Sequence, residues 1–283
     1  MSGFKSDFLS GKNILITGGG TGLGREMAIT FSKIGGRVSI LSRKREVLEE
    51  TSRDIRKMGY EVEYEQCDVR YPDQIANAVE NIEARTGPIN SLVNNAAGNF
   101  ISRTEDLSNK AFDTVIAIVL QGTVYFSMEM GKKWIKNNSG GVILNIVTTY
   151  SWTGSAYVVP SAVSKAGVLA LTRSLAVEWG PRGIRSVAIA PGPFKTKGAW
   201  NNLVPTGEIE EKMVSRNPMR RLGTTEEISE LSAFLISDDA SYINGEVVTI
   251  DGGEWLEGAG EFNALSAMPD EFWEGLKSMR SKR

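Results

Sequence analysis

The feature that most constrains this chain is a glycine-rich turn between its first predicted strand, residues 13–17, and the helix predicted to begin near Arg25. Glycine lets the backbone turn sharply, and free N–H groups at a helix N-terminus attract phosphate. The spacing Gly-x-x-x-Gly-x-Gly predicts a dinucleotide pyrophosphate on this turn. A turn tightened only for packing is the alternative. The predicted pyrophosphate contacts are Gly18, Gly20, Thr21, Gly22, Leu23 and Gly24.

Short β-branched runs alternate with amphipathic stretches of helical length along the rest of the chain, and this alternation is typical of parallel strands joined by helical crossovers. No linker rich in Pro or Gly divides the 283 residues. We therefore predict a single α/β domain over residues 1–283, a doubly wound, Rossmann-type parallel sheet of seven strands with helices on both faces. The predicted strands are 13–17, 37–41, 61–66, 91–94, 142–147, 185–190 and 246–250.

Two segments depart from this alternation. Residues 195–218 follow a strand and contain helix-breaking Gly and Pro, as a lid or binding loop would. The tail, residues 254–283, ends in a predicted helix on which Phe272, Leu276 and Met279 share one face. We expect this helix to pack on the lid or on a neighbouring subunit.

The composition excludes several kinds of chemistry. Histidine is absent and Cys67 is the only cysteine. This rules out a His general base, a Ser-His-Asp or Cys-His nucleophile, an intrachain disulfide and a Cys/His zinc site, and we predict no metal. Acid–base work must fall to Tyr, Lys, Asp, Glu or Ser. With a net charge of −2 and no basic stripe, nucleic acid is not an expected partner.

We expect a cytoplasmic protein without a membrane partner. The first residues lack the apolar run of a secretory signal, and no stretch approaches the roughly 18 apolar residues of a membrane span. The C-terminal Ser281-Lys282-Arg283 differs from the peroxisomal Ser-Lys-Leu address in its basic last residue.

The end of the second predicted strand bears on the choice of cofactor. NAD-specific proteins place an acidic residue there, on the ribose 2′-hydroxyl. This chain has Ser42, Arg43 and Lys44, whose positive charges suit a 2′-phosphate, so we expect NADP(H). In the alternative, Arg43 and Lys44 only begin a solvated helix face with Glu46 and Glu49.

Five motifs taken together resemble the short-chain dehydrogenase/reductases over nearly the whole chain. They are the glycine turn, Asp68-Val69, Asn94-Asn95-Ala96-Ala97-Gly98, Pro191-Gly192 and Asp251-Gly252-Gly253. The resemblance implies that the adenine lies next to Asp68 and Val69. It also implies a cofactor floor at Asn95, Ala96 and Ala97, and a nicotinamide beside Pro191, Gly192, Pro193 and Phe194.

The usual catalytic pattern of that family is broken here. Lys165 is present, but Ser161 stands where the tyrosine of Tyr-x-x-x-Lys belongs, Thr148 replaces the usual serine, and Val119 replaces the helix asparagine. The ordinary alcohol and ketone machinery is therefore missing. Either the acid comes from elsewhere or the protein is a non-catalytic, NADP(H)-sensing interaction protein.

One subset of the family, the 2,4-dienoyl-CoA reductases of the mitochondrial type, breaks the pattern in this way. In these enzymes a tyrosine fifteen positions before the lysine replaces the missing one, and Tyr150 stands there. The resemblance implies NADPH-dependent reduction of 2,4-dienoyl-CoA to 3-enoyl-CoA in the β-oxidation of unsaturated fatty acids. The residues that resemble this subset lie in stretches 67–70, 94–100, 158–161, 193–198 and 260–263.

The same resemblance implies the roles of the catalytic residues. Tyr150 and Asn99 would act like an oxyanion hole on the thioester oxygen, which gains negative charge after hydride transfer. Lys165 would bind the nicotinamide ribose, and Ser161, one helical turn away, would orient the nicotinamide or relay a proton. Tyr157 is a rival for the phenol role, although a place in the substrate pocket suits it better.

The resemblance also implies an acyl-CoA thioester as the substrate, with Arg70, Phe100 and Ser108 as further contacts, and a homotetramer as the assembly. One position departs from the subset, because Asn202 stands where a substrate-binding arginine is expected. Reduction of another enoyl or 3-oxoacyl thioester is therefore the alternative reaction.

Overall fold

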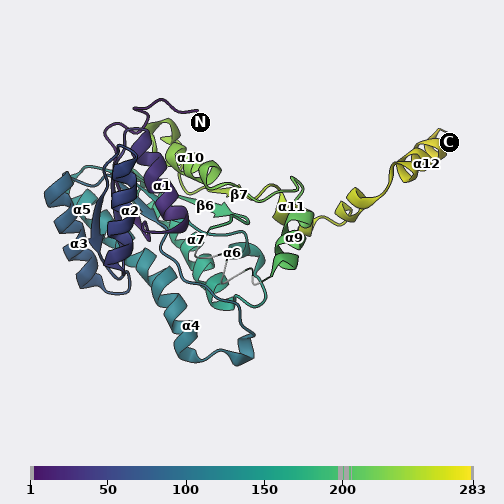
Figure 1. The fold of residues 1–283 in the computed structure, drawn as a ribbon, viewed down its shortest axis with the longest axis horizontal. Coiled ribbons are helices and arrows are strands. Elements are labelled where there is room, and N and C mark those ends of the chain that lie inside the picture. The colour runs from purple at the N-terminus through teal and green to yellow at the C-terminus, as the bar shows by residue number, and fades with distance from the viewer. Residues whose placement is uncertain (1–2, 197–199, 201–203, 205, 282–283) are drawn as a thin grey trace.

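A seven-stranded sheet runs through the centre of the computed structural model, which describes residues 3–196, 200, 204 and 206–281 (Figure 1). All its pairings are parallel, and the strand order β3-β2-β1-β4-β5-β6-β7 confirms the doubly wound fold. The order reverses between β1 and β4, which creates a switch point at the carboxyl edge. The strands are β1 (Asn13–Thr17), β2 (Arg37–Ser42), β3 (Glu63–Gln66), β4 (Ser91–Asn94), β5 (Gly141–Ile146), β6 (Ile184–Pro191) and β7 (Val247–Ile250).

Helices cover both faces of the sheet because its central strands are apolar on both sides. One core packs the sheet against α1 (Gly22–Lys33), α2 (Arg45–Lys57) and α10 (Thr225–Ile236). The other packs it against α3 (Pro72–Thr86), α5 (Gly122–Asn137) and α7 (Val159–Trp179). Helix α1 begins at Gly22 and not near Arg25, because the glycine turn already ends at Thr21, whose backbone is extended and which caps the helix.

One helix of the second layer is unusually long. It joins α4 (Asn109–Ile116), a π-helical turn (Ala117–Gln121) and α5, and within the described chain it alone is long and apolar enough to cross a membrane by length and composition. Phe126, Met130 and Trp134 on its α5 part are buried in the core, as expected of a core helix. Its opposite side exposes Met128.

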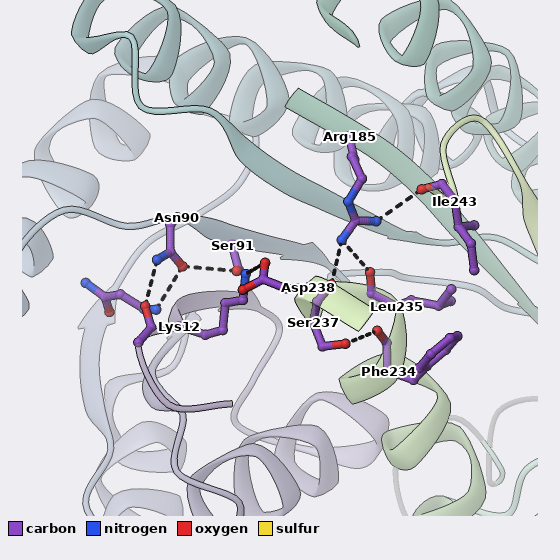
Figure 2. A network of polar contacts seen from close by, with 11 residues as sticks. Lys12, Asn90, Ser91, Arg185, Phe234, Leu235, Ser237, Asp238 and Ile243 are labelled. Carbon is purple, nitrogen blue, oxygen red and sulfur yellow. Dashed lines mark hydrogen bonds and ion pairs between the residues drawn. The ribbon is translucent and has the colours of Figure 1, made fainter. Parts of the chain in front are cut away.

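The partly buried guanidinium of Arg185 ties the amino end of β6 to the end of α10, at the edge of the sheet opposite the switch point (Figure 2). Arg185 donates to the carbonyl oxygens of Leu235 at 3.0 Å, Ser237 at 3.0 Å and Ile243 at 3.1 Å. A positive charge at a helix C-terminus also meets the negative end of the helix dipole. Burial nevertheless lowers the pKa of Arg185, an effect that the nearby Asp238 opposes.

Substituting Arg185 with alanine is expected to lower the free energy of unfolding by about 3 kcal/mol, because three carbonyls lose a charged donor. Urea titration measures the loss. Arg182→Ala, at an exposed position before the same strand, is the control and is expected to change stability by less than about 0.5 kcal/mol. Equal stability of the two variants would contradict this role for Arg185.

Beyond α11 (Glu254–Ala259), the chain that leads to α12 (Asp270–Arg280) extends away from the sheet and its helices (Figure 1). Its last helix, α12, confirms the predicted amphipathic helix, and the rings of Phe272 and Trp273 on it touch at 5.3 Å between centroids. In Figure 1 α12 does not lie on α9 (Gly207–Arg216), a helix within the predicted lid. The other helices in the described part of the chain are α6 (Tyr150–Thr153) and α9, with 3-10 turns at 104–106, 180–182, 238–240 and 263–267.

Candidate active site

The glycine turn is clamped to the loop after β4 at the switch point. The Asn95 amide donates to the carbonyls of Thr17 at 3.0 Å and Gly18 at 3.3 Å. In return, the Thr17 hydroxyl accepts the N–H groups of Asn95 and Ala96, both at 3.0 Å. A Cβ on Gly24 would lie 2.5 Å from the Gly18 oxygen and the Asn95 amide, so only glycine fits.

The same turn lies beside the segment that follows β6. A Cβ on Gly22 would lie 3.6 Å from the Thr196 side chain, and the Pro193 carbonyl accepts the N–H of Gly223 at 3.0 Å. The predicted pyrophosphate turn therefore lies beside Thr196, two residues after the predicted nicotinamide segment. Glycines, an open helix N-terminus and two strand ends make a cradle that fits a dinucleotide.

Arg43 lies at the end of β2, in a depression that it lines together with Gln66 and Asp68. Gln66 donates to the Arg43 carbonyl at 2.8 Å, which fixes the backbone there. In the described part of the chain, neither Arg43 nor Lys44 forms an ion pair with a carboxylate. The neighbouring Arg45 does, with Glu49 at 2.9 Å. The arrangement therefore leaves Arg43 available for an anion.

Asp68 and Arg70, predicted for the adenine and for the substrate, contact each other. The Arg70 guanidinium donates to the carboxylate at 2.6 and 3.0 Å, and its carbon lies 5.5 Å from the Tyr71 ring centre. Burial alone would raise the pKa of Asp68, but hydrogen bonds from Arg70 outweigh it and keep that pKa below its ordinary value. A substrate role for Arg70 stays a prediction. To bind the substrate, the Arg70 guanidinium would have to exchange Asp68 for a group of the substrate.

A phenol, a hydroxyl and an amide meet near the carboxyl end of β5. The Tyr150 hydroxyl lies 3.1 Å from the Ser161 hydroxyl and 3.5 Å from the Asn99 amide nitrogen. Tyr150 begins the one-turn helix α6, where its N–H donates to the Thr148 hydroxyl at 3.1 Å. Asn99 is held by its own loop, since its side-chain oxygen accepts the Phe100 N–H at 2.9 Å. The structure therefore brings together the three predicted polar groups.

Lys165 lies one turn along α7 from Ser161, and both side chains are buried. Its ammonium donates to the carbonyl of Ile146 at the end of β5. Burial lowers the pKa of Lys165 to about 8.

Cys67 is not a candidate nucleophile. Burial and the nearby carboxylates of Asp68 and Glu65 raise the pKa of its thiol to about 12, so the thiol stays protonated at neutral pH.

A buried polar network beneath this cluster was not predicted. The Asn94 amide donates to Asn145 at 2.9 Å and to Ser127 at 3.1 Å, and the Asn145 amide donates to Thr172 at 2.9 Å. The network joins β4 and β5 to α5 and α7, and thereby fixes the helix that carries Lys165. Polar residues at strand ends were visible in the sequence, but their pairing across the sheet was not.

The π-helical turn around Val119 was also not predicted. Val119 is buried, and its carbonyl accepts the Thr123 hydroxyl at 2.7 Å. Turns of this kind often occur at functional sites. A Cβ on the next glycine, Gly122, would lie 2.7 Å from the Val69 side chain, so the helix passes close to the predicted adenine loop. Only Gly122 hinted at this approach in the sequence.

The remaining predicted substrate residues, Tyr157 and Ser108, hydrogen-bond within the surrounding loops. Tyr157 is exposed, with a left-handed φ of 66°, and its carbonyl accepts the Ser102 N–H at 2.9 Å. Because Tyr150 is the phenol that meets Ser161, Tyr157 is left as a candidate pocket wall. Ser108 caps α4 by accepting the Ala111 N–H at 3.2 Å. Part of the predicted lid (197–199, 201–203 and 205), including Asn202, lies outside the described residues.

The fold and the site define a dinucleotide-dependent α/β oxidoreductase. A family model described as enoyl-(acyl carrier protein) reductase matches residues 18–254. A probable 2,4-dienoyl-CoA reductase of Caenorhabditis elegans, named as (3E)-enoyl-CoA-producing, is 43% identical over 95% of this chain and 89% of its own length. A probable 2,4-dienoyl-CoA reductase of Bacillus subtilis, named as (2E)-enoyl-CoA-producing, is 44% identical over 87% of this chain and 97% of its own.

Solved structures agree with these matches. A short chain dehydrogenase from Bacillus anthracis is 45% identical, with a TM-score of 0.79 over 86% of this chain and 97% of that one. A gluconate 5-dehydrogenase from Burkholderia cenocepacia, in complex with NADP and tartrate, is 27% identical, with a TM-score of 0.83 over 89% of this chain and 98% of that one. The chain belongs to the short-chain dehydrogenase/reductase family.

Proposed function

We propose that this enzyme reduces 2,4-dienoyl-CoA to 3-enoyl-CoA with NADPH. The observation that carries the proposal is the meeting of the Tyr150 hydroxyl with Ser161, at the position where the usual family tyrosine is missing. Tyr150 restores a phenol to the site from another element, and Asn99 adds a second donor beside it. The names of the two relatives at 43% and 44% identity support the same reaction.

Bound NADPH supplies the hydride. Hydride addition at the δ carbon of the diene leaves negative charge on the thioester oxygen, which the Tyr150 hydroxyl and the Asn99 amide would stabilise. A proton taken up from solvent at the α carbon then gives the 3-enoyl thioester. Ser161 keeps the phenol in place. The Lys165 ammonium, one turn away, holds positive charge beside the pair and is the group that would bind the ribose hydroxyls. The backbone N–H groups at the start of α1 would bind the pyrophosphate.

A substrate panel tests this reaction. NADPH oxidation is expected with a 2,4-dienoyl-CoA, and product analysis is expected to find the 3-enoyl thioester. The family model favours one alternative, an enoyl group on a carrier protein, so carrier-bound and CoA-bound substrates are compared directly. Tight NADPH binding without turnover of any thioester would reject the proposal and favour a cofactor-sensing protein.

The preference for NADPH is proposed to depend on Arg43. Arg43→Ala is expected to raise the KM for NADPH about tenfold or more and leave that for NADH unchanged, because only the 2′-phosphate loses a charge-assisted hydrogen bond. Steady-state kinetics with both cofactors measures this. Arg45→Ala is the matched control, since Arg45 is paired with Glu49. Equal effects on both cofactors would assign the 2′-phosphate contact elsewhere.

We also propose that the protein assembles as a homotetramer. Met128 on the long helix and Phe272, Trp273 and Met279 on α12 are exposed in the single chain, and burying them on association would be favourable. Light scattering is expected to find a tetramer, and removal of residues 261–283 is expected to weaken it. A monomer at micromolar concentration would reject the assembly.

A further inference from the structure

The motif Asp251-Gly252-Gly253, at the end of β7, builds a rigid turn that the proposed chemistry does not use. The Asp251 carboxylate accepts the N–H groups of Gly253 and Trp255, both at 2.9 Å, and so caps the first turn of α11. Asn217, at the end of α9, donates to the Asp251 carbonyl at 2.7 Å. A Cβ on Gly252, whose φ is 65°, would lie 2.6 Å from the Asn217 oxygen. The direction in which α11 leaves the sheet is therefore fixed.

This direction brings Trp255 against Trp152. The two rings meet edge to face, with centroids 5.8 Å apart and planes at 82°. Trp152 belongs to α6, the helix that begins with Tyr150. Two residues along a helix correspond to a rotation of roughly 200°, so Tyr150 and Trp152 point to nearly opposite sides of α6.

Helix α6 depends on packing for its orientation. It has four residues, and the N–H groups of Ser151 and Gly154 close its turn at 3.0 and 3.1 Å. A single turn is unstable without tertiary contacts. Tyr150 meets α7 through Ser161 on one side, and Trp152 meets Trp255 on the other.

We infer that Trp255 is a positioning residue for Tyr150, acting through Trp152 and α6. The inference deepens the proposed function and rests on it. The separation of 3.5 Å between the Tyr150 hydroxyl and the Asn99 amide is at the limit for a hydrogen bond. A small rotation of α6 would break this contact and separate the two donors proposed for the thioester oxygen.

The kinetic test compares Trp255→Ala with Trp255→Phe. The alanine variant is expected to lower kcat about three- to tenfold, the effect of one aromatic pair, with both KM values within about twofold. Phenylalanine retains an aromatic edge and is expected to restore most of kcat. Trp273→Ala is the matched control, because it removes another tryptophan ring from the C-terminal segment and is expected to leave kcat unchanged.

Double variants test the route of the effect. Trp152→Ala is expected to match Trp255→Ala, and the double variant is expected to fall no further than either. In a Tyr150→Phe background, Trp255→Ala is expected to cost nothing more, since the group that it positions is gone. Additive losses, or a loss in NADPH affinity in place of kcat, would overturn the inference.

Hydrogen exchange gives a readout that does not depend on the substrate. Trp255→Ala is expected to speed exchange of the amides of residues 151–154 several-fold, and Trp273→Ala is expected to leave them unchanged. Unaltered exchange in Trp255→Ala overturns the inference even if no thioester is turned over. If the unsubstituted protein reduces no dienoyl thioester, the proposed function fails on its own, and the exchange measurement still decides whether Trp255 holds α6.

Discussion

Tyr150→Phe is expected to lower kcat for a 2,4-dienoyl-CoA by about two to three orders of magnitude, with little change in the KM for NADPH. The phenol hydroxyl is a preorganised donor to an oxygen that becomes negative only as the reaction proceeds, and loss of one such donor has an effect of this size. The substitution removes one oxygen next to Ser161, so the fold is expected to survive. Stopped-flow measurement of NADPH oxidation separates the chemical step from product release.

Tyr157→Phe is the control for that substitution. Tyr157 is the other tyrosine near the loop that carries Asn99, but it is exposed and contacts that loop through its carbonyl. We expect loss of the Tyr157 hydroxyl to change kcat by less than about threefold. If Tyr157→Phe is the slower variant, the phenol role belongs to Tyr157, and the meeting of Tyr150 with Ser161 is only structural.

Lys165→Met is expected to abolish NADPH-dependent turnover and at the same time to stabilise the cofactor-free protein. A buried ammonium with a carbonyl as its partner is destabilising, since burial lowers its pKa from 10.5 to about 8. At neutral pH this shift corresponds to a destabilisation of the folded protein by about 3 kcal/mol. Methionine fills a similar volume without a charge. Because the hydrogen bond to Ile146 is lost as well, we expect the free energy of unfolding of the variant to rise by about 2 kcal/mol.

The pH dependence identifies the source of that gain. Below pH 8 Lys165 is protonated in both the folded and the unfolded state, and its full burial penalty applies. Between about pH 8 and 10.5 the folded protein releases the proton that the unfolded chain keeps, so its stability relative to Lys165→Met rises with pH. Urea unfolding at about pH 7 and about pH 9.5 measures this. Lys136→Met, at an exposed position, is the control, and a gain independent of pH would contradict the explanation.

The fold and much of the cofactor cradle follow from short-range patterns. The alternation of strands and helices predicted all seven strands to within two residues at each end. The glycine spacing predicted the turn at the switch point, where Gly24 admits no side chain. These features depend on neighbours a few positions apart, whose periodicity and backbone freedom are visible in any single chain. The start of α1 was misplaced by three residues, because the sequence does not reveal how tightly the turn before the helix closes.

The arrangement of the site depends on contacts between residues far apart in the chain. Family resemblance pointed to Tyr150 and Asn99, but the tertiary fold determines that Asn99 approaches Tyr150 and that Tyr150 approaches Ser161. The contact of Trp255 with Trp152 and the network from Asn94 to Thr172 had no signal in local sequence. A side chain's neighbours across a sheet are set by the packing of whole layers, and this packing minimises the energy of the entire fold. Periodicity in the sequence therefore predicts the elements, and only their tertiary arrangement determines which polar groups meet.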